Sequence, residues 1–162
     1  MHRLFSIAAV VLLMLCPTTW AAPPALIQER EGSAPIRPNE VLRLFKQCSR
    51  STPQFDGTPK RASPQDIEKL ERALPEFIKQ QQGAGLRAPK ADQAYRGQYA
   101  EFKRNGVVYI YGAYFPATYG VEVGLKPDGT AVVVCDGGAS FWGVVYEPGA
   151  ARFTQLEING WP

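Results

Sequence analysis

The stretch YRGQYAEFKRNGVVYIYGAYFP, residues 95–116, decides the fold of this chain. Asn105-Gly106 at its centre is the strongest short sequence marker of a β-hairpin turn, and it lies between two runs rich in aromatic and β-branched residues. We expect strands over Arg96–Lys103 and Val107–Phe115. Because so short a connection cannot hold a crossover helix, these two strands must pair antiparallel.

The alternation of strand-like runs and turn residues continues to the end of the chain, with a turn about every ten residues. Further strands are expected over Gly120–Leu125, Thr130–Cys135, Ser140–Glu147 and Arg152–Ile158. The segments between them contain Pro-Ala-Thr, Pro-Asp-Gly, Gly-Gly and Pro-Gly-Ala, which favour turns. About six strands joined in sequence order predict an antiparallel meander.

Two helices are expected upstream of the strands. The first begins at Asn39, a good N-cap residue, and places Val41, Leu44, Phe45 and Cys48 on one apolar face. This spacing predicts that the Cys48 side chain points toward the core.

The second helix has the strongest start markers in the chain, because Ser63 can cap it and Pro64 suits its first position. Pro75 predicts a kink or a break near Ala73-Leu74. Its apolar stripe consists of Ile67, Leu70, Leu74, Phe77 and Ile78. The predicted class is therefore α+β, with two N-terminal helices packed on one face of an antiparallel meander of about six strands.

The domain organisation follows from the N-terminal composition. Residues 1–21 have the basic start, apolar run and small-residue exit of a secretory signal peptide, with cleavage near Ala21. Residues 22–38 form a flexible Pro-rich leader, and 39–162 form a single α+β domain. Cys16 also suggests a lipoprotein, but the large Leu15 before it disfavours lipidation. The expected location is periplasmic or secreted, with no transmembrane segment in the mature chain, since the apolar run is shorter than the ~20 residues that span a bilayer.

The mature chain lacks the usual catalytic machinery. His2 is the only histidine and leaves with the signal peptide, which excludes mechanisms that need a histidine base and the common zinc sites. No motif indicates a cofactor, a metal site or a catalytic residue. Removal of Arg3 lowers the net charge from +3 to +2, and the remaining charges are interspersed, so nucleic acid is not an expected partner.

The cysteine count points to one disulfide. Cys48 and Cys135 are the two cysteines that remain after cleavage, and a pair of cysteines in an exported domain usually forms a bond. The stretch CDGGASFWG, residues 135–143, then favours a hairpin turn at Gly137-Gly138 over a reactive centre.

The predicted strands are apolar on both faces, which a half-solvated sheet would not be. Trp142, Val144 and Tyr146 share one face, and Phe141, Gly143 and Val145 share the other. Three explanations stay open: the sheet curves strongly and is covered, the second face binds a small ligand, or it docks a protein or a second copy. The candidate binding surface consists of Tyr109, Tyr111, Tyr114, Asp136, Phe141 and Trp142.

The function hypothesis is an exported, non-enzymatic protein-binding factor of the inhibitor, immunity or accessory type, with a cell-envelope protein as its partner. One alternative is a small-ligand carrier with a pocket lined by Tyr111, Tyr114 and Trp142. A second alternative is a glycan hydrolase that uses a pair of acidic residues. The order of elements is similar to several small exported α+β folds, cystatin-like ones among them, in architecture alone.

Overall fold

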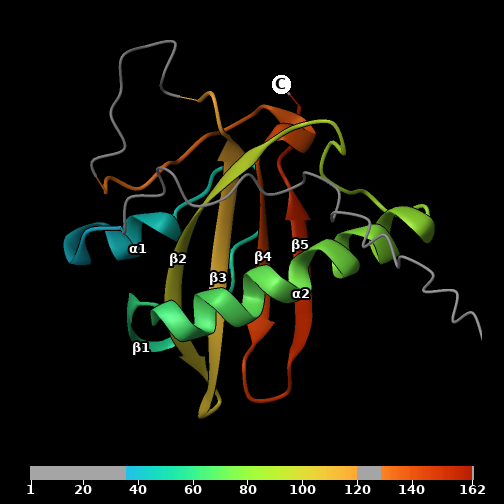
Figure 1. Cartoon of the computed structure of the whole chain (residues 1–162). Coiled ribbons are helices and arrows are strands. Elements are labelled where there is room, and N and C mark those ends of the chain that lie inside the picture. The colour runs from blue at the N-terminus through green and yellow to red at the C-terminus, as the bar shows by residue number, and fades with distance from the viewer. Residues whose placement is uncertain (1–35, 120–128, 162) are drawn as a thin grey trace, which may run out of the picture.

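The computed structural model describes residues 36–119 and 129–161, and it shows an α+β domain (Figure 1). Five strands form one antiparallel sheet in the order β1-β2-β3-β4-β5, so each strand pairs with its sequence neighbours. The strands are β1 (Asp56–Arg61), β2 (Tyr95–Arg104), β3 (Val107–Pro116), β4 (Trp142–Glu147) and β5 (Arg152–Ile158). The α+β class and the antiparallel meander are confirmed, with five strands in the described residues and without strong curling of the sheet.

The β2–β3 hairpin forms as the sequence predicts. Its register runs from Tyr95 opposite Pro116 to Arg104 opposite Val107. Asn105 and Gly106 both have positive φ, 53° and 77°, as a two-residue type I′ turn requires. Side chains on these long strands alternate between the two faces of the sheet, so this hairpin sets which aromatic residues enter which core.

The helix α2 (Pro64–Gly83) covers one face of the sheet, and Figure 1 shows it crossing in front of the strands. The Ser63 side chain accepts a hydrogen bond from the Asp66 amide at 3.1 Å, which confirms the predicted cap. Of the kink or break predicted near Ala73-Leu74, the break is wrong, because the helix continues through Pro75 to Gly83. Proline removes one backbone hydrogen bond, and burial of Leu74 and Ile78 on either side of it outweighs that loss.

The first helix is much shorter than predicted. It consists of the 3-10 turn η1 (Pro38–Glu40) and α1 (Val41–Leu44), and Asn39 lies inside the 3-10 turn and not at an N-cap. Val41, Leu44 and Phe45 still enter the core. Ile36, the first described residue, is also buried there.

The two helices pack on opposite faces of the sheet, which corrects the expectation that both lie on one face. The core beneath α2 contains Leu70, Leu74, Ile78, Tyr95, Ile110, Tyr114, Trp142, Val144, Tyr146 and Ile158. The core beneath α1 contains Ile36, Val41, Leu44, Phe45, Ala100, Phe102, Tyr109, Tyr111, Ala113, Ala131 and Val145. Both sheet faces are apolar because both are covered.

The segment 129–136 helps α1 to cover its face of the sheet. A strand over Thr130–Cys135 was predicted, and this is wrong, since the segment has no strand pairing and β4 pairs with β3 instead. Ala131 and Val133 nevertheless point into the core beneath α1. The β-branched composition thus gives an extended chain, but one that lies across the sheet face as a cover. We call residues 129–136 the cover segment. The predicted strand at 120–125 lies outside the described residues.

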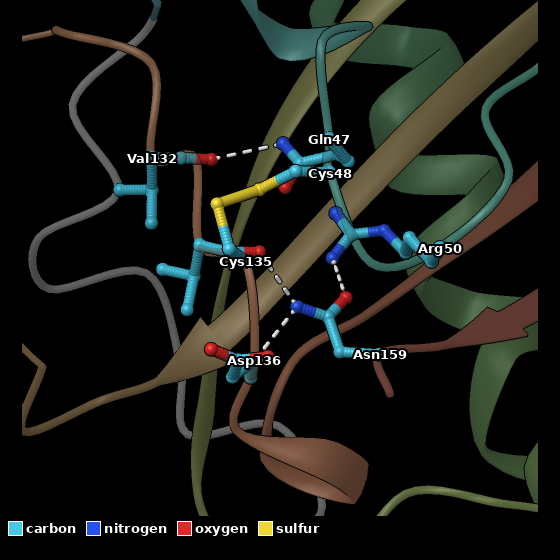
Figure 2. The surroundings of a disulfide bond; sticks show 8 residues. Gln47, Cys48, Arg50, Val132, Cys135, Asp136 and Asn159 are labelled. Atoms are coloured by element: carbon cyan, nitrogen blue, oxygen red, sulfur yellow. Dashed lines mark hydrogen bonds between the residues drawn. A yellow bond between two sulfur atoms is a disulfide. The ribbon is translucent and has the colours of Figure 1, made fainter. Parts of the chain in front are cut away.

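Side chains bind the backbone of the cover segment where a neighbouring strand would otherwise do so. Near its end, the Asn159 amide donates to the carbonyl oxygens of Val134 at 2.8 Å and Asp136 at 2.9 Å (Figure 2). The Cys48–Cys135 disulfide joins the same end to the loop after α1.

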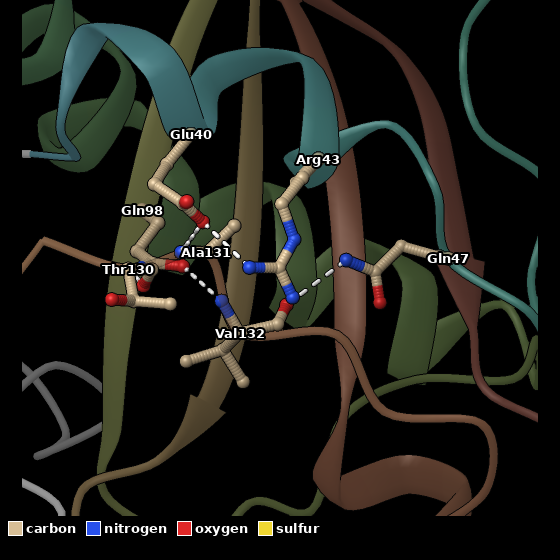
Figure 3. A network of polar contacts seen from close by, with 7 residues as sticks. All are labelled: Glu40, Arg43, Gln47, Gln98, Thr130, Ala131 and Val132. Atoms are coloured by element: carbon tan, nitrogen blue, oxygen red, sulfur yellow. Dashed lines mark hydrogen bonds and ion pairs between the residues drawn. The ribbon is translucent and has the colours of Figure 1, made fainter.

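The start of the cover segment is held in the same way (Figure 3). The Gln98 amide donates to the Thr130 carbonyl at 2.6 Å and accepts from the Val132 amide at 2.8 Å. The carboxylate of Glu40 accepts from the Ala131 amide, and Gln47 donates to the Val132 carbonyl. These bonds satisfy backbone groups that burial would otherwise leave unpaired.

The strand β1 overlaps the stretch 51–60, which is rich in turn residues and was not predicted to be a strand. It is a short edge strand whose residues are mostly exposed, and its register shifts between Asp56 and Lys60. Such an irregular edge carries no alternating apolar pattern, which is why the sequence did not indicate it.

Candidate contact surface at one end of the sheet

One end of the sheet gathers four chain segments that are far apart in sequence. Because neighbouring strands run antiparallel, β2 and β4 begin at the end where β3 and β5 finish. The segments before β2, after β3, before β4 and after β5 therefore meet there. The stretch 135–143 lies at this end, with the 3-10 turn η2 (Gly138–Ser140) leading into β4.

The two glycines of this stretch have a different role from the hairpin turn predicted for them. Gly137 and Gly138 have positive φ, 92° and 53°; Gly137 precedes η2 and Gly138 is its first residue. A Cβ on Gly137 would lie 2.4 Å from the Phe141 ring, and one on Gly138 would lie 2.4 Å from the Trp161 ring. The glycines thus give each aromatic ring a flat backbone surface to pack on.

This end also carries the most exposed aromatic ring among the large apolar residues that the structure describes. Trp161 is 66% exposed, Leu86 57% and Tyr119 38%. The Tyr119 ring contacts Phe141 edge-on at 5.2 Å between centroids. The Arg87 guanidinium donates to the Asn159 carbonyl at 3.0 Å, which brings the chain around Leu86 to the end of β5. We call Leu86, Tyr119 and Trp161 the end patch.

A buried polar network supports the backbone under the end patch. The Asn159 side chain is fully buried, accepts a hydrogen bond from Arg50 and donates two to the cover segment (Figure 2). Arg50 also donates to the Tyr111 hydroxyl at 3.2 Å. Burial raises the pKa of the Tyr111 phenol, and the nearby Arg50 charge opposes this shift. The C-terminal strand, the cover segment and the loop after α1 are therefore joined at one residue.

The disulfide pairs Cys48 with Cys135, as the cysteine count predicts, with the two Cα atoms 4.8 Å apart. The expectation that Cys48 points into the core is wrong, because both cysteines are exposed. The reason is that α1 ends at Leu44, so Cys48 does not continue its buried face. A disulfide is typical of an oxidising compartment outside the cytoplasm.

The six residues predicted as one binding surface are distributed over three environments. Tyr109 and Tyr111 are buried beneath α1, while Tyr114 and Trp142 are buried beneath α2 with their rings stacked at 4.0 Å. Phe141 is buried at the end of the sheet, and Asp136 is exposed beside the disulfide. Of the six, Phe141 contacts the end patch, through the Tyr119 ring.

The tyrosines beneath α2 meet a carboxylate from that helix. Glu71 accepts hydrogen bonds from the Tyr99 and Tyr114 hydroxyls, each at 2.6 Å. Burial raises the pKa of Tyr114 well above its usual value, and the charge of Glu71 adds to the shift. Gly97 and Gly112 provide the space, since a Cβ there would lie 2.1 Å from Tyr99 and 2.9 Å from Tyr114. This cluster fixes α2 on the sheet.

The residues of the end patch were missed because each is an isolated apolar residue outside a periodic run. Leu86 and Tyr119 fall in segments with turn composition, and Trp161 follows a glycine after the last strand. A large apolar residue next to glycine or proline in a predicted loop was the available indication, and it is a weak one.

Comparison with known proteins gives no match: neither a family model, a curated protein nor a solved structure resembles the chain. Within residues 36–119 and 129–161, no helix is long and apolar enough to cross a membrane. The same residues contain no group of three or more His, Cys, Asp or Glu side chains placed to hold a metal ion.

Replacement of Gly138 by alanine tests the packing of Trp161. We expect Gly138→Ala to lower the free energy of unfolding by about 1–2 kcal/mol, because a Cβ is strained at positive φ. The Trp161 ring must also move, since it occupies the space of that Cβ. Urea unfolding and acrylamide quenching of tryptophan fluorescence measure the two effects. Gly149→Ala is the control, because its Cβ would meet no atom within 4 Å, and an equal effect of both variants would contradict the assignment.

Proposed function

We propose that this chain is an exported, non-enzymatic protein-binding factor that acts in the cell envelope, of the inhibitor, immunity or accessory type. The observation that carries the proposal is the end patch, in which Trp161, Tyr119 and Leu86 are exposed at one end of the sheet. Exposed aromatic residues are enriched at the centres of protein–protein interfaces. Monomeric proteins tolerate single exposed apolar residues, but a group of them on a fixed frame favours a contact site.

The support under the end patch favours recognition of a folded protein. Trp161 lies on Gly138, whose amide donates to the Gly160 carbonyl at 3.0 Å, and the Asn159 amide donates to Phe141 at 2.9 Å. The backbone of the patch is thus hydrogen-bonded before any partner arrives. A preformed surface loses little conformational entropy on binding, so more of the contact energy becomes affinity.

The exported location is part of the proposal. It rests on the predicted signal peptide at residues 1–21 and on the Cys48–Cys135 disulfide. The ligand-carrier alternative has less support, because the three aromatic residues expected to line its pocket, Tyr111, Tyr114 and Trp142, pack inside the two cores. The glycan-hydrolase alternative rests on no specific pair of acidic residues.

An affinity experiment with the chain from Ala22 tests the proposal. The immobilised protein is incubated with an envelope extract from the organism that makes it, and the retained proteins are identified and purified. We expect one partner whose Kd rises about tenfold or more when Trp161 is replaced by alanine, since a central aromatic contact contributes at least 1–2 kcal/mol.

Two matched variants serve as controls for this experiment. Leu42 and Val107 are exposed apolar residues outside the end patch, on α1 and at the opposite end of the sheet. Leu42→Ala and Val107→Ala are expected to leave the Kd unchanged. Retention of no protein by the parent chain, or equal losses of affinity at Trp161, Leu42 and Val107, contradicts the proposal.

A further inference from the structure

The two edges of the sheet are not equivalent. The edge strand β1 is irregular and contains Pro59, and its Lys60 forms an ion pair with Glu101 of β2 at 3.1 Å. Such features prevent another strand from pairing. At the other edge, β5 pairs only with β4 among the described residues. It has seven residues and contains no proline, so its outer backbone groups present a pairing edge.

The register of β5 on β4 shows which of its backbone groups point outward. The Asn159 backbone amide donates to the Phe141 carbonyl, so Asn159 directs its backbone groups toward β4. In an antiparallel pair every second residue does the same, which here means Glu157, opposite Gly143, and Gln155, opposite Val145. The residues between them, Leu156 and Ile158, therefore direct their N–H and C=O groups away from the sheet.

A bulge changes the alternation in the first half of β5. Val145 lies opposite Gln155 and the next residue, Tyr146, lies opposite Phe153, so Thr154 is the extra residue. As a result, Phe153 has the same orientation as Leu156, with outward backbone groups and a side chain in the core beneath α2. Arg152 lies opposite Glu147 and Glu157 opposite Gly143, which places both charged side chains on the other face.

This arrangement is complementary to itself. If a second β5 runs antiparallel with Phe153 opposite Leu156, the reciprocal pair forms by symmetry, and both pairs join outward-pointing backbone groups. The same register places Arg152 of each copy opposite Glu157 of the other. Two Phe153–Leu156 pairs then meet on one face of the joined sheet, and two Arg152–Glu157 pairs meet on the other face.

We propose that β5 pairs with β5 of a second copy of this chain, so that two five-stranded sheets join into one. The Arg152 guanidinium can serve two carboxylates, since its Nε and Nη2 contact Glu147 at 2.8 Å and leave Nη1 for Glu157 of the second copy. Within its own chain, Glu157 accepts a hydrogen bond from Gln155 at 3.3 Å. The twofold match of charge and apolar groups favours a second copy over an unrelated strand.

Sedimentation equilibrium of the chain from Ala22, from about 1 to 500 µM, tests this pairing. We expect a monomer–dimer equilibrium in which Arg152→Glu and Glu157→Arg each raise the dimer Kd at least tenfold, because like charges then lie opposite one another. The double variant Arg152→Glu/Glu157→Arg is expected to return the Kd to within about threefold of the parent value, since it restores opposite charges in this register.

The controls separate pairing at β5 from general effects on the fold. Arg152→Glu also places an acid beside Glu147 of the same chain, where the two repel each other. The double variant keeps this repulsion, so its recovery of the dimer reports the contact between the two copies. Lys60→Glu at the other edge and Trp161→Ala in the end patch are expected to leave the dimer unchanged. Thermal unfolding verifies that each variant folds.

Several results would overturn the proposal. A monomer at every concentration rules out the second copy, and so does a dimer that responds equally to Lys60→Glu and to Arg152→Glu. Failure of the double variant to recover excludes this register. If the chain remains monomeric and Arg152→Glu instead weakens capture of an envelope protein, β5 binds a strand of that protein. The proposed function does not depend on any of these outcomes, because it rests on the end patch.

Discussion

Above pH 10 the free energy of unfolding is expected to fall steeply as the pH rises. Three buried tyrosines produce this effect. Burial raises the pKa of Tyr95 to about 12, with smaller opposing contributions from its hydrogen bonds. Burial likewise raises the pKa of Tyr111 and, further, that of Tyr114.

The sign follows from comparing the folded and unfolded states. In the unfolded chain these phenols ionise near pH 10, whereas in the folded chain they keep their protons. Their contribution to stability is therefore complete below pH 10 and is lost as the pH rises toward the folded-state pKa values, because the unfolded state then binds fewer protons. Between its unfolded and folded pKa values a tyrosine contributes up to about 1.4 kcal/mol per pH unit, so each phenol that stays protonated in the folded chain makes the slope steeper.

Urea unfolding followed by circular dichroism at pH 8, 10.5, 11 and 11.5 measures this slope. Absorbance of phenolate at 295 nm is expected to include a step that coincides with unfolding. In Tyr111→Phe the slope should become shallower, by up to about 1.4 kcal/mol per pH unit, because one phenol no longer titrates. The variant also loses the hydrogen bond from Arg50, which lowers stability at every pH but leaves the slope unaffected. An unchanged slope in this variant contradicts the assignment.

The sequence was most informative where one local rule determines the structure. Asn105-Gly106 predicted a hairpin that the structure contains, and Ser63-Pro64 predicted the start of α2. The pairing of Cys48 with Cys135 followed from counting. In each case the deciding residues are adjacent in sequence or are the only ones of their kind in the mature chain.

The sequence was least informative where tertiary contacts replaced local ones. The run from Thr130 to Cys135 has the composition of a strand, and the side chains that hold its backbone, such as Gln98 and Asn159, lie 23 to 34 residues away. No periodicity predicts such bonds. The prediction of a binding surface that includes Tyr111 and Trp142 was affected for the same reason. These two side chains become buried only when α1, α2 and the cover segment pack on the sheet.

Opening of the Cys48–Cys135 disulfide is expected to lower the free energy of unfolding by about 4 kcal/mol. The bond joins residues 87 apart, and the chain-entropy model gives a loss of this size for a loop of that length. Both cysteines are exposed, so replacement by alanine creates no cavity in either core. The effect therefore arises mainly from the greater freedom of the unfolded chain. Either single variant should lose as much as the double variant, apart from the thiol that it leaves free.

The disulfide also determines how the cover segment opens. In the double variant the segment keeps its bonds to Gln98, Gln47 and Asn159, so it should remain on the sheet and exchange its amides faster than the parent does. Hydrogen exchange at Ala131 and Val132 measures this local opening, and urea unfolding measures the global loss. Reductant should reproduce both effects in the parent chain and change neither in the variant. Labelling of denatured, unreduced protein should find no free thiol. Two reactive thiols would show that the disulfide does not form. A loss in the free energy of unfolding below about 1 kcal/mol would show that the disulfide does not stabilise the domain, so that the cover segment depends on its hydrogen bonds alone.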